Sequence, residues 1–137
     1  MQIQLIPPAP ITSADVLSTL NRVWGYADLR PLQARAIDAV LDHRDSVVVM
    51  PTGGGKSLCY QLPPLLTLDL TVVISPLISL MKDQVDSLRE LGVEARQLNS
   101  TSSVEEKREI AALARNGSLR LLFVCPGRLA SERLEQF

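Results

Sequence analysis

The sequence has very few of the residues that metal centres and disulfide frameworks require. It contains one histidine, His43, and two cysteines, Cys59 and Cys125, which lie far apart in apolar surroundings. Neither cysteine belongs to a Cys-x-x-Cys pair, so the ligand spacing of a metal site is absent, and we expect no zinc in this segment. Two unpaired thiols are typical of a reducing compartment, and we therefore expect a cytoplasmic protein.

Long apolar runs and an excess of one charge are also missing. No apolar run approaches the roughly 20 residues needed to span a bilayer, so we expect no membrane partner. Residues 1–10 carry no Lys or Arg and three prolines, unlike a signal peptide. The 137 residues include 14 Lys and Arg against 15 Asp and Glu, for a net charge of −1. This balance excludes a generally basic protein that coats nucleic acid, but it permits local contacts with phosphate.

The sequence does have a regular alternation of β-branched runs and helical patterns, over a length suited to one domain. We interpret residues 1–11 as an extended lead-in and residues 12–137 as one α/β domain with a mostly parallel sheet. The mainly apolar runs at 47–50 and 70–75 predict strands buried on both faces. Further strands are expected at 93–98 and 119–125. Helices are expected at 12–24, 31–41, 77–91 and 103–116. Another helix should run from Lys56 until Pro63 and Pro64 stop or bend it, and a last one should begin at 128.

The most specific pattern follows the first of these expected strands. Residues 50–57 read Met-Pro-Thr-Gly-Gly-Gly-Lys-Ser, so that a strand runs into glycines and Lys-Ser opens a helix. Backbone N–H groups in such a loop can converge on phosphate oxygens, and the helix start adds further donors. The pattern predicts a phosphate loop in which Lys56 is the catalytic cation at the β- and γ-phosphates and Ser57 ligates Mg²⁺. The remaining loop residues are Thr52, Gly53, Gly54 and Gly55.

One position departs from the general phosphate-loop pattern G-x-x-x-x-G-K-[ST], whose first glycine falls on Met50. The alternative is a glycine-rich turn in which the lysine is incidental. We favour the phosphate loop, because a preceding strand and a following helix are the context that the motif requires.

A longer stretch carries a resemblance to a known family. Residues 50–63, Met-Pro-Thr-Gly-Gly-Gly-Lys-Ser-Leu-Cys-Tyr-Gln-Leu-Pro, resemble motif I of RecQ-family DNA helicases, which belong to superfamily 2 and lack the first glycine. Trp-Gly-Tyr at 24–26 and Leu-Arg-Pro-Leu-Gln at 29–33 are similar to motif 0 of that family, and residues 73–84 to its motif Ia. Residues 98–101 and 123–129 are similar to the region that follows. The resemblance covers about residues 13–137 and implies a RecA-like P-loop NTPase domain that binds ATP.

The resemblance implies roles for residues of motif 0, which holds the adenine base in this family. Gln33 would bind the edge of the base through its amide, which both donates and accepts. Arg30 would stack on the base or hydrogen-bond beside it, and Tyr26 would pack near it. The alternative for Gln33 and Arg30 is a solvated helix start, and the phosphate loop downstream favours the adenine contact.

The resemblance also implies a path for DNA, because motif Ia lies along the bound strand in this family. Contacts there are with phosphates and position the strand without reading its sequence. Other interpretations stay open: Leu77, Leu80 and Met81 as the buried face of a helix, and Lys82 as a solvated charge. The candidate contacts are Ser75, Pro76, Leu77, Lys82, Asn99 and Arg128.

The last two candidates carry reservations of their own. Asn99 begins a stretch that fits a polar turn equally well. Next to Arg128, this chain has Gly127 where the family usually has a glutamate. Any role that the family's glutamate carries is therefore in doubt for this chain.

The sequence stops before the Asp-Glu-Ala-His motif with which the family orients Mg²⁺ and positions the attacking water. We therefore expect an N-terminal piece of a 3′–5′ DNA helicase, with an incomplete RecA-like domain that binds ATP, Mg²⁺ and single-stranded or partly duplex DNA without hydrolysing ATP alone. The alternative is a non-catalytic nucleotide- or DNA-binding module. In related folds later strands separate those at 47–50 and 70–75, so we expect 47–50 to lack neighbours.

Overall fold

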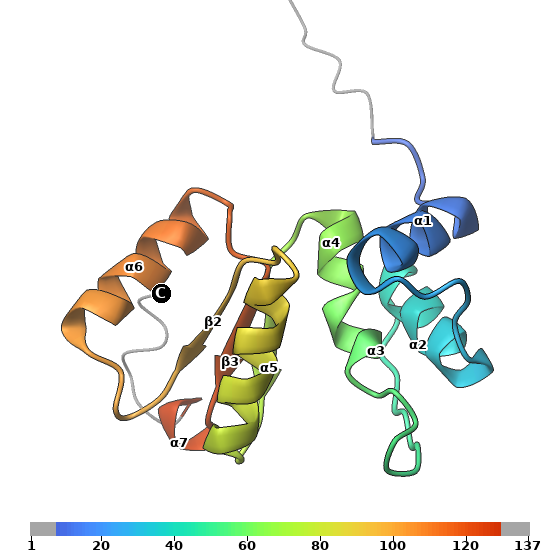
Figure 1. Ribbon diagram of the computed structural model, residues 1–137. Coiled ribbons are helices and arrows are strands. Elements are labelled where there is room, and N and C mark those ends of the chain that lie inside the picture. Colours follow the sequence, from blue (N-terminus) through green and yellow to red (C-terminus); the bar gives the residue numbers. More distant parts are fainter. Residues whose placement is uncertain (1–7, 130–137) are drawn as a thin grey trace, which may run out of the picture.

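The computed structural model describes residues 8–129, without the side chains of 128 and 129. Figure 1 shows a group of helices, α1 to α4, beside a parallel sheet with α5 and α6, which confirms the α/β class. Of the helices in the described part, none has the length and apolar character that crossing a membrane requires. The elements are α1 (Ser13–Trp24), α2 (Pro31–Leu41), α3 (Leu58–Gln61), α4 (Pro63–Thr67), β1 (Thr71–Ile74), α5 (Ile78–Glu90), β2 (Ala95–Leu98), α6 (Val104–Arg115), β3 (Leu121–Val124) and α7 (Pro126–Leu129).

The sheet is built around β3, in the strand order β1-β3-β2 with both pairings parallel. All four residues of β3 are buried. Leu121 and Phe123 pack with Met81, Val85 and Leu88 of α5. On the opposite face, Leu122 and Val124 pack with Ile110 of α6. The alternating side chains of one strand therefore fix which helix covers which face.

Strand β1 is covered on one face only, so the expectation that 70–75 is buried on both faces is wrong. Val72 and Ile74 are 48% and 54% exposed. Their register partners are Leu122 and Val124, which place them on the face that α6 covers. The cluster under α6 is built from β2, β3 and the segments beside them, and it does not include β1. On the other face Val73 packs against the cluster under α5.

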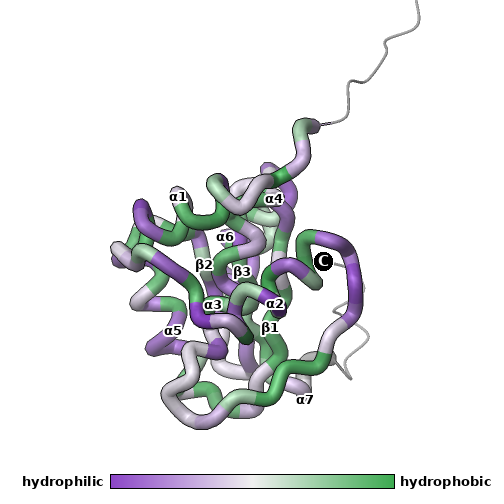
Figure 2. The backbone as a smooth tube through the Cα atoms, turned by 90° about the vertical axis from the view of Figure 1, so that its right-hand side faces the viewer, coloured by the Kyte–Doolittle hydropathy of each residue, from purple (hydrophilic) through white to green (hydrophobic). Residues whose placement is uncertain are grey.

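The strand predicted at 47–50 is not formed. Val47 and Val49 are 93% and 84% exposed, and within the described residues the sheet consists of β1, β3 and β2 alone. Figure 2 shows this hydrophobic stretch after α2 running outside the sheet. A β-branched run forms a strand where a neighbour supplies ladder hydrogen bonds and covers its side chains. Here no described segment does so, as the expected lack of neighbours at 47–50 implied.

Most helices begin and end close to the residues expected from local sequence signals. Capping boxes at Thr12 and Ser103 begin α1 and α6, where the helices expected at 12–24 and 103–116 start. Gly92, with φ +82°, follows the end of α5, close to the end of the helix expected at 77–91. The helix expected from Lys56 begins at Leu58 and is divided into α3 and α4 next to Pro63, because proline supplies no backbone donor and crowds the preceding turn.

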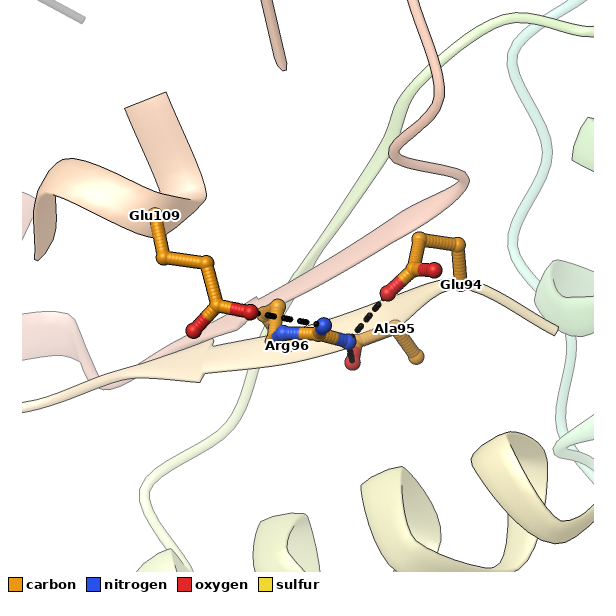
Figure 3. A network of polar contacts seen from close by, with 4 residues as sticks. All are labelled: Glu94, Ala95, Arg96 and Glu109. Carbon is orange, nitrogen blue, oxygen red and sulfur yellow. Dashed lines mark hydrogen bonds and ion pairs between the residues drawn. The ribbon is translucent and has the colours of Figure 1, made fainter. Parts of the chain in front are cut away.

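A partly buried arginine joins β2 to α6 (Figure 3). The Arg96 side chain is 12% exposed and forms ion pairs with Glu94 and with Glu109 of α6, the second at 3.1 Å. It also donates to the carbonyl oxygen of Ala95 at 2.9 Å. The network supplies partners for both terminal nitrogens of Arg96, on a strand otherwise bounded by the buried Ala95 and Leu98, whereas the buried Nε of Arg96 has no hydrogen-bond partner among the described residues.

Candidate nucleotide-binding site

The loop at 50–57 owes its shape to its glycines. Gly53 and Gly55 have φ values of +80° and +78°, in the left-handed region that favours glycine. Between them, the Gly54 nitrogen donates to the Pro51 oxygen at 2.9 Å, and a Cβ at Gly54 would lie 2.9 Å from that oxygen. Positive φ at Gly53 and Gly55 and the close approach of Pro51 at Gly54 therefore each favour glycine.

Two side chains from the start of α2 hold this loop by its carbonyl groups. Gln33 is 4% exposed, and its Nε2 donates to the Gly55 oxygen at 3.0 Å while its Oε1 accepts from the Arg30 nitrogen at 2.8 Å. Arg30 donates through Nη1 to the Gly53 oxygen at 2.8 Å. A solvated helix start is therefore the wrong interpretation of Gln33. The structure brings motif 0 and the phosphate loop together.

The loop keeps its N–H groups available. Among the described residues, the backbone N–H groups of Gly55, Lys56 and Ser57 form no hydrogen bond. The exposed Lys56 makes a long contact from Nζ to the Met50 oxygen, at 3.4 Å. Helix α3 has four residues, too few for a large macrodipole, so donors to an anion here would have to come from the loop's own N–H groups and Lys56.

A cavity of about 450 Å³ lies between the phosphate loop and the segment joining α1 to α2. This volume is in the range of small-molecule sites. Tyr26, 54% exposed, is among its lining residues, as are Arg30, Gln33 and Ser57. Other lining residues were not predicted from the sequence. Among them, Gln61 is a polar residue within 50–63 whose side chain is only 7% exposed. The missed residues are Trp24, Gly25, Ala27, Asp28, Leu58 and Gln61.

The candidate DNA contacts of motif Ia lie after β1 and on α5. The Ser75 hydroxyl accepts from the Leu77 nitrogen at 3.3 Å, and Pro76 and Leu77 are exposed. Lys82 is exposed and forms an ion pair with Asp86 at 2.5 Å, and this hydrogen bond and charge raise the pKa of Lys82. Of the residues that could form a buried helix face, Met81 is buried, whereas Leu77 and Leu80 are 56% and 45% exposed.

Asn99 directly follows β2, in the segment that leads to α6. It is 3% exposed, and its Oδ1 accepts from the nitrogen and hydroxyl of Thr101 at 2.8 and 2.5 Å. Asn99 and Lys82 line a second cavity, of about 250 Å³, together with Arg96. Arg128 belongs to α7, and its side chain lies outside the described part of the chain.

Comparison with known proteins identifies relatives of this chain. The model of the DEAD/DEAH box helicase family matches residues 30–136. The chain is 46% identical over 126 residues to the ATP-dependent DNA helicase RecQ of Haemophilus influenzae, covering 92% of this chain and 20% of that protein. It is 50% identical over 113 residues to the protein of the same name from Pasteurella multocida, covering 82% and 18%. The chain thus spans about a fifth of the length of these relatives.

Solved structures show the same fold at low sequence identity. A DUF1998 helicase, MrfA, solved bound to DNA and AMPPNP, matches with a TM-score of 0.73 and 20% identity over 93% of this chain and 19% of its own. The chain therefore has part of a RecA-like helicase fold. Because the family model extends over most of the sequence, from residue 30 to residue 136, the protein belongs to the DEAD/DEAH box helicase family.

Proposed function

We propose that this chain is the ATP-binding part of an ATP-dependent 3′–5′ DNA helicase of RecQ type. The observation that carries the proposal is the attachment of the Gly53 and Gly55 carbonyls to Arg30 and Gln33, beside the 450 Å³ cavity. The relatives named RecQ support this choice within the family, and a structural neighbour was solved with DNA and AMPPNP.

The adenine base would occupy the part of the cavity lined by residues 24–33, with the phosphates at the loop. Gln33 can serve both loop and base, because an amide has two N–H donors and two lone pairs and the described contacts use one of each. Arg30 likewise uses Nη1 for Gly53 and retains further N–H groups. Tyr26 would cover the base.

At the phosphates, Lys56 would donate to the β- and γ-oxygens together with the N–H groups of Gly55, Lys56 and Ser57. Ser57 lines the nucleotide cavity, so its hydroxyl suits a magnesium ion whose other ligands are phosphate oxygens and water. When bound, Mg²⁺ neutralises charge that develops on the transferred phosphoryl group. Thr52 and Gly54 complete the loop around the phosphate chain.

DNA would pass along 75–82, where Ser75, Pro76, Leu77 and Lys82 follow the carboxyl end of β1. Asn99 and Arg128 are further proposed contacts. The proposal places the protein in the cytoplasm, where unpaired thiols such as Cys59 are maintained.

The polypeptide of 137 residues has no Asp-Glu-Ala-His sequence. We therefore expect this chain alone to bind ATP with no measurable turnover.

The test is a binding titration of the chain with a fluorescent ATP analogue in Mg²⁺, monitored by anisotropy. Lys56→Ala should weaken binding by about tenfold or more, since hydrogen bonds to charged groups contribute about 1.5–3 kcal/mol. Lys107→Ala on α6 removes an equal charge away from the loop and should leave the affinity unchanged. Equal affinity of the Lys56→Ala and unmodified chains would contradict the proposal. Hydrolysis of ATP by this chain, stimulated by single-stranded DNA, would contradict the expected lack of turnover.

A further inference from the structure

One hydrogen bond connects the phosphate-loop side of the molecule directly to α5. The Tyr60 hydroxyl donates to Oε1 of Gln84 at 2.8 Å. Within the described residues, only one other side-chain hydrogen bond, from Arg120 to the Leu68 oxygen, joins residues before 70 to residues after 70. Because Leu68 is close to β1 along the chain, Tyr60–Gln84 is the polar link that spans the two parts seen in Figure 1.

Tyr60 is held close to the phosphate loop. Its backbone nitrogen donates to the Ser57 oxygen at 3.2 Å, so Tyr60 sits one turn after the proposed magnesium ligand. Its ring packs edge-on against Phe123 of β3, with centroids 6.4 Å apart and an interplanar angle of 74°. A tyrosine hydroxyl, with an ordinary pKa of about 10, is protonated at neutral pH and can donate, and partial burial raises the pKa of Tyr60 further.

Gln84 lies on the helix that carries the proposed DNA contacts. It is two residues beyond Lys82 on α5, which begins directly after 75–77. Gln84 and Ser57 line one cavity of about 240 Å³, so the helix and the start of α3 face each other there. A shift of α5 would move Gln84 and, through the Tyr60 hydroxyl, the turn that contains Ser57.

We propose that the Tyr60–Gln84 hydrogen bond couples the affinity for ATP to the occupancy of the DNA strand along α5. Both are positioning residues, since neither lines the nucleotide cavity of 450 Å³. The inference rests on the proposed function, because it requires both ligands to bind. Coupling between two sites is reciprocal, so each ligand changes the affinity for the other by the same factor.

The experiment measures the dissociation constant of the fluorescent ATP analogue with and without a saturating oligo(dT), and that of the oligo(dT) with and without ATP analogue. For each ligand, the ratio of its dissociation constants without and with the other ligand measures the coupling. For the unmodified chain we expect the two ratios to agree and to be about fivefold or larger. Tyr60→Phe keeps the ring on Phe123 but removes the donor, and Gln84→Leu removes the acceptor. In both variants the ratio should fall to about 1 while each ligand alone keeps its affinity.

Two further variants separate positioning from general destabilisation. Gln84→Glu retains an acceptor for the Tyr60 hydroxyl and should retain the ratio. Thr67→Ala removes a hydroxyl contact inside α4, to the Pro63 oxygen at 3.4 Å, and should also retain it. If circular dichroism shows that Tyr60→Phe does not fold, the ratio measured for Gln84→Leu alone tests the coupling.

The outcomes distinguish this inference from the function on which it rests. Binding of both ligands with an unchanged ratio in Tyr60→Phe and Gln84→Leu overturns the coupling and leaves the proposed function standing. A ratio of 1 in the unmodified chain also overturns the coupling and leaves the proposed function standing. Absence of nucleotide binding by the unmodified chain overturns both.

Discussion

The amide nitrogen of Gln33 lies 3.0 Å from the carbonyl oxygen of Gly55, and a Cβ placed at Gly55 would be 2.2 Å from the same nitrogen. The helix start and the loop therefore fit together only where the loop has no side chain. Because Gln33 is 4% exposed, its amide has little room to move aside. The residue proposed to bind adenine and the loop proposed to bind phosphate are thus parts of one rigid arrangement.

Gly55→Ala should weaken binding of the ATP analogue by clearly more than Gly53→Ala. Both positions have positive φ, and a side chain in that region costs about 1–2 kcal/mol. A Cβ at Gly53 meets no atom within 4 Å, whereas one at Gly55 also collides with Gln33. Titration calorimetry of the two variants measures the difference, and equal losses would show that backbone strain alone is responsible.

Removing the collision partner tests the same contact from the other side. In the Gly55→Ala background, Gln33→Ala should recover part of the lost thermal stability, because the Cβ then has space. It should not recover ATP affinity, because the bond to the loop carbonyl and the proposed contact with adenine are both lost. Thermal unfolding followed by circular dichroism gives the first quantity, and the binding titration gives the second.

Arg96→Ala should lower the free energy of unfolding by about 2 kcal/mol, because it leaves Glu94 and Glu109 without their partner. Breaking a fully buried ion pair costs about 3–5 kcal/mol. The smaller value applies here because the Glu94 and Glu109 side chains are 38% and 56% exposed and stay hydrated. Arg108→Ala, on the exposed side of α6, is the control, and urea unfolding of the two variants is the measurement. Equal midpoints would show that the network contributes no net stability.

Features set by neighbours in the sequence could be predicted. The capping boxes at Thr12 and Ser103 and the break at Pro63 depend on contacts within four residues, and each is present. The loop glycines were also identified from motif and spacing. The resemblance singled out Gln33 as a contact to adenine, but its burial and its hydrogen bond to the Gly55 oxygen were not predicted. The adenine, magnesium and DNA roles stay predictions, because they concern ligands.

Features set by distant segments could not be predicted from composition. The runs at 47–50 and 70–75 are both rich in β-branched residues, yet one forms no strand and the other is exposed on one face. The lack of neighbours at 47–50 was expected only from the strand order of related folds. What differs is the presence of a partner strand and a covering helix, which composition does not encode. The Tyr60–Gln84 hydrogen bond likewise joins residues 24 positions apart, on helices whose packing decides the contact.

The helix cap at Asp15 should make stability depend on pH in the acid range. Hydrogen bonds from the backbone and side chain of Thr12 lower the pKa of Asp15, so its carboxylate stabilises the folded state above the ordinary aspartate pKa of about 3.9. This contribution is lost as the pH falls through the lowered value. The stability difference between the unmodified chain and Asp15→Asn should therefore narrow below about pH 4. Thr12→Ser should keep the dependence and Thr12→Ala should reduce it, and a pH-independent difference would contradict the assignment.

Amide hydrogen exchange should separate the segment before the phosphate loop from the centre of the sheet. The N–H groups at 47–49 belong to no ladder within the described residues, so they should exchange at nearly the rate of an unfolded peptide. Those of β3, paired on both sides and buried, should exchange only on global unfolding. Mass spectrometry of peptides covering 44–50 and 119–125 compares the two directly. Addition of ATP and Mg²⁺ should slow exchange at 53–58, where the phosphates are proposed to bind, and should leave 47–49 fast, because no backbone partner is supplied there. Protection at 47–49 equal to that of β3 would show that this run is paired in solution after all.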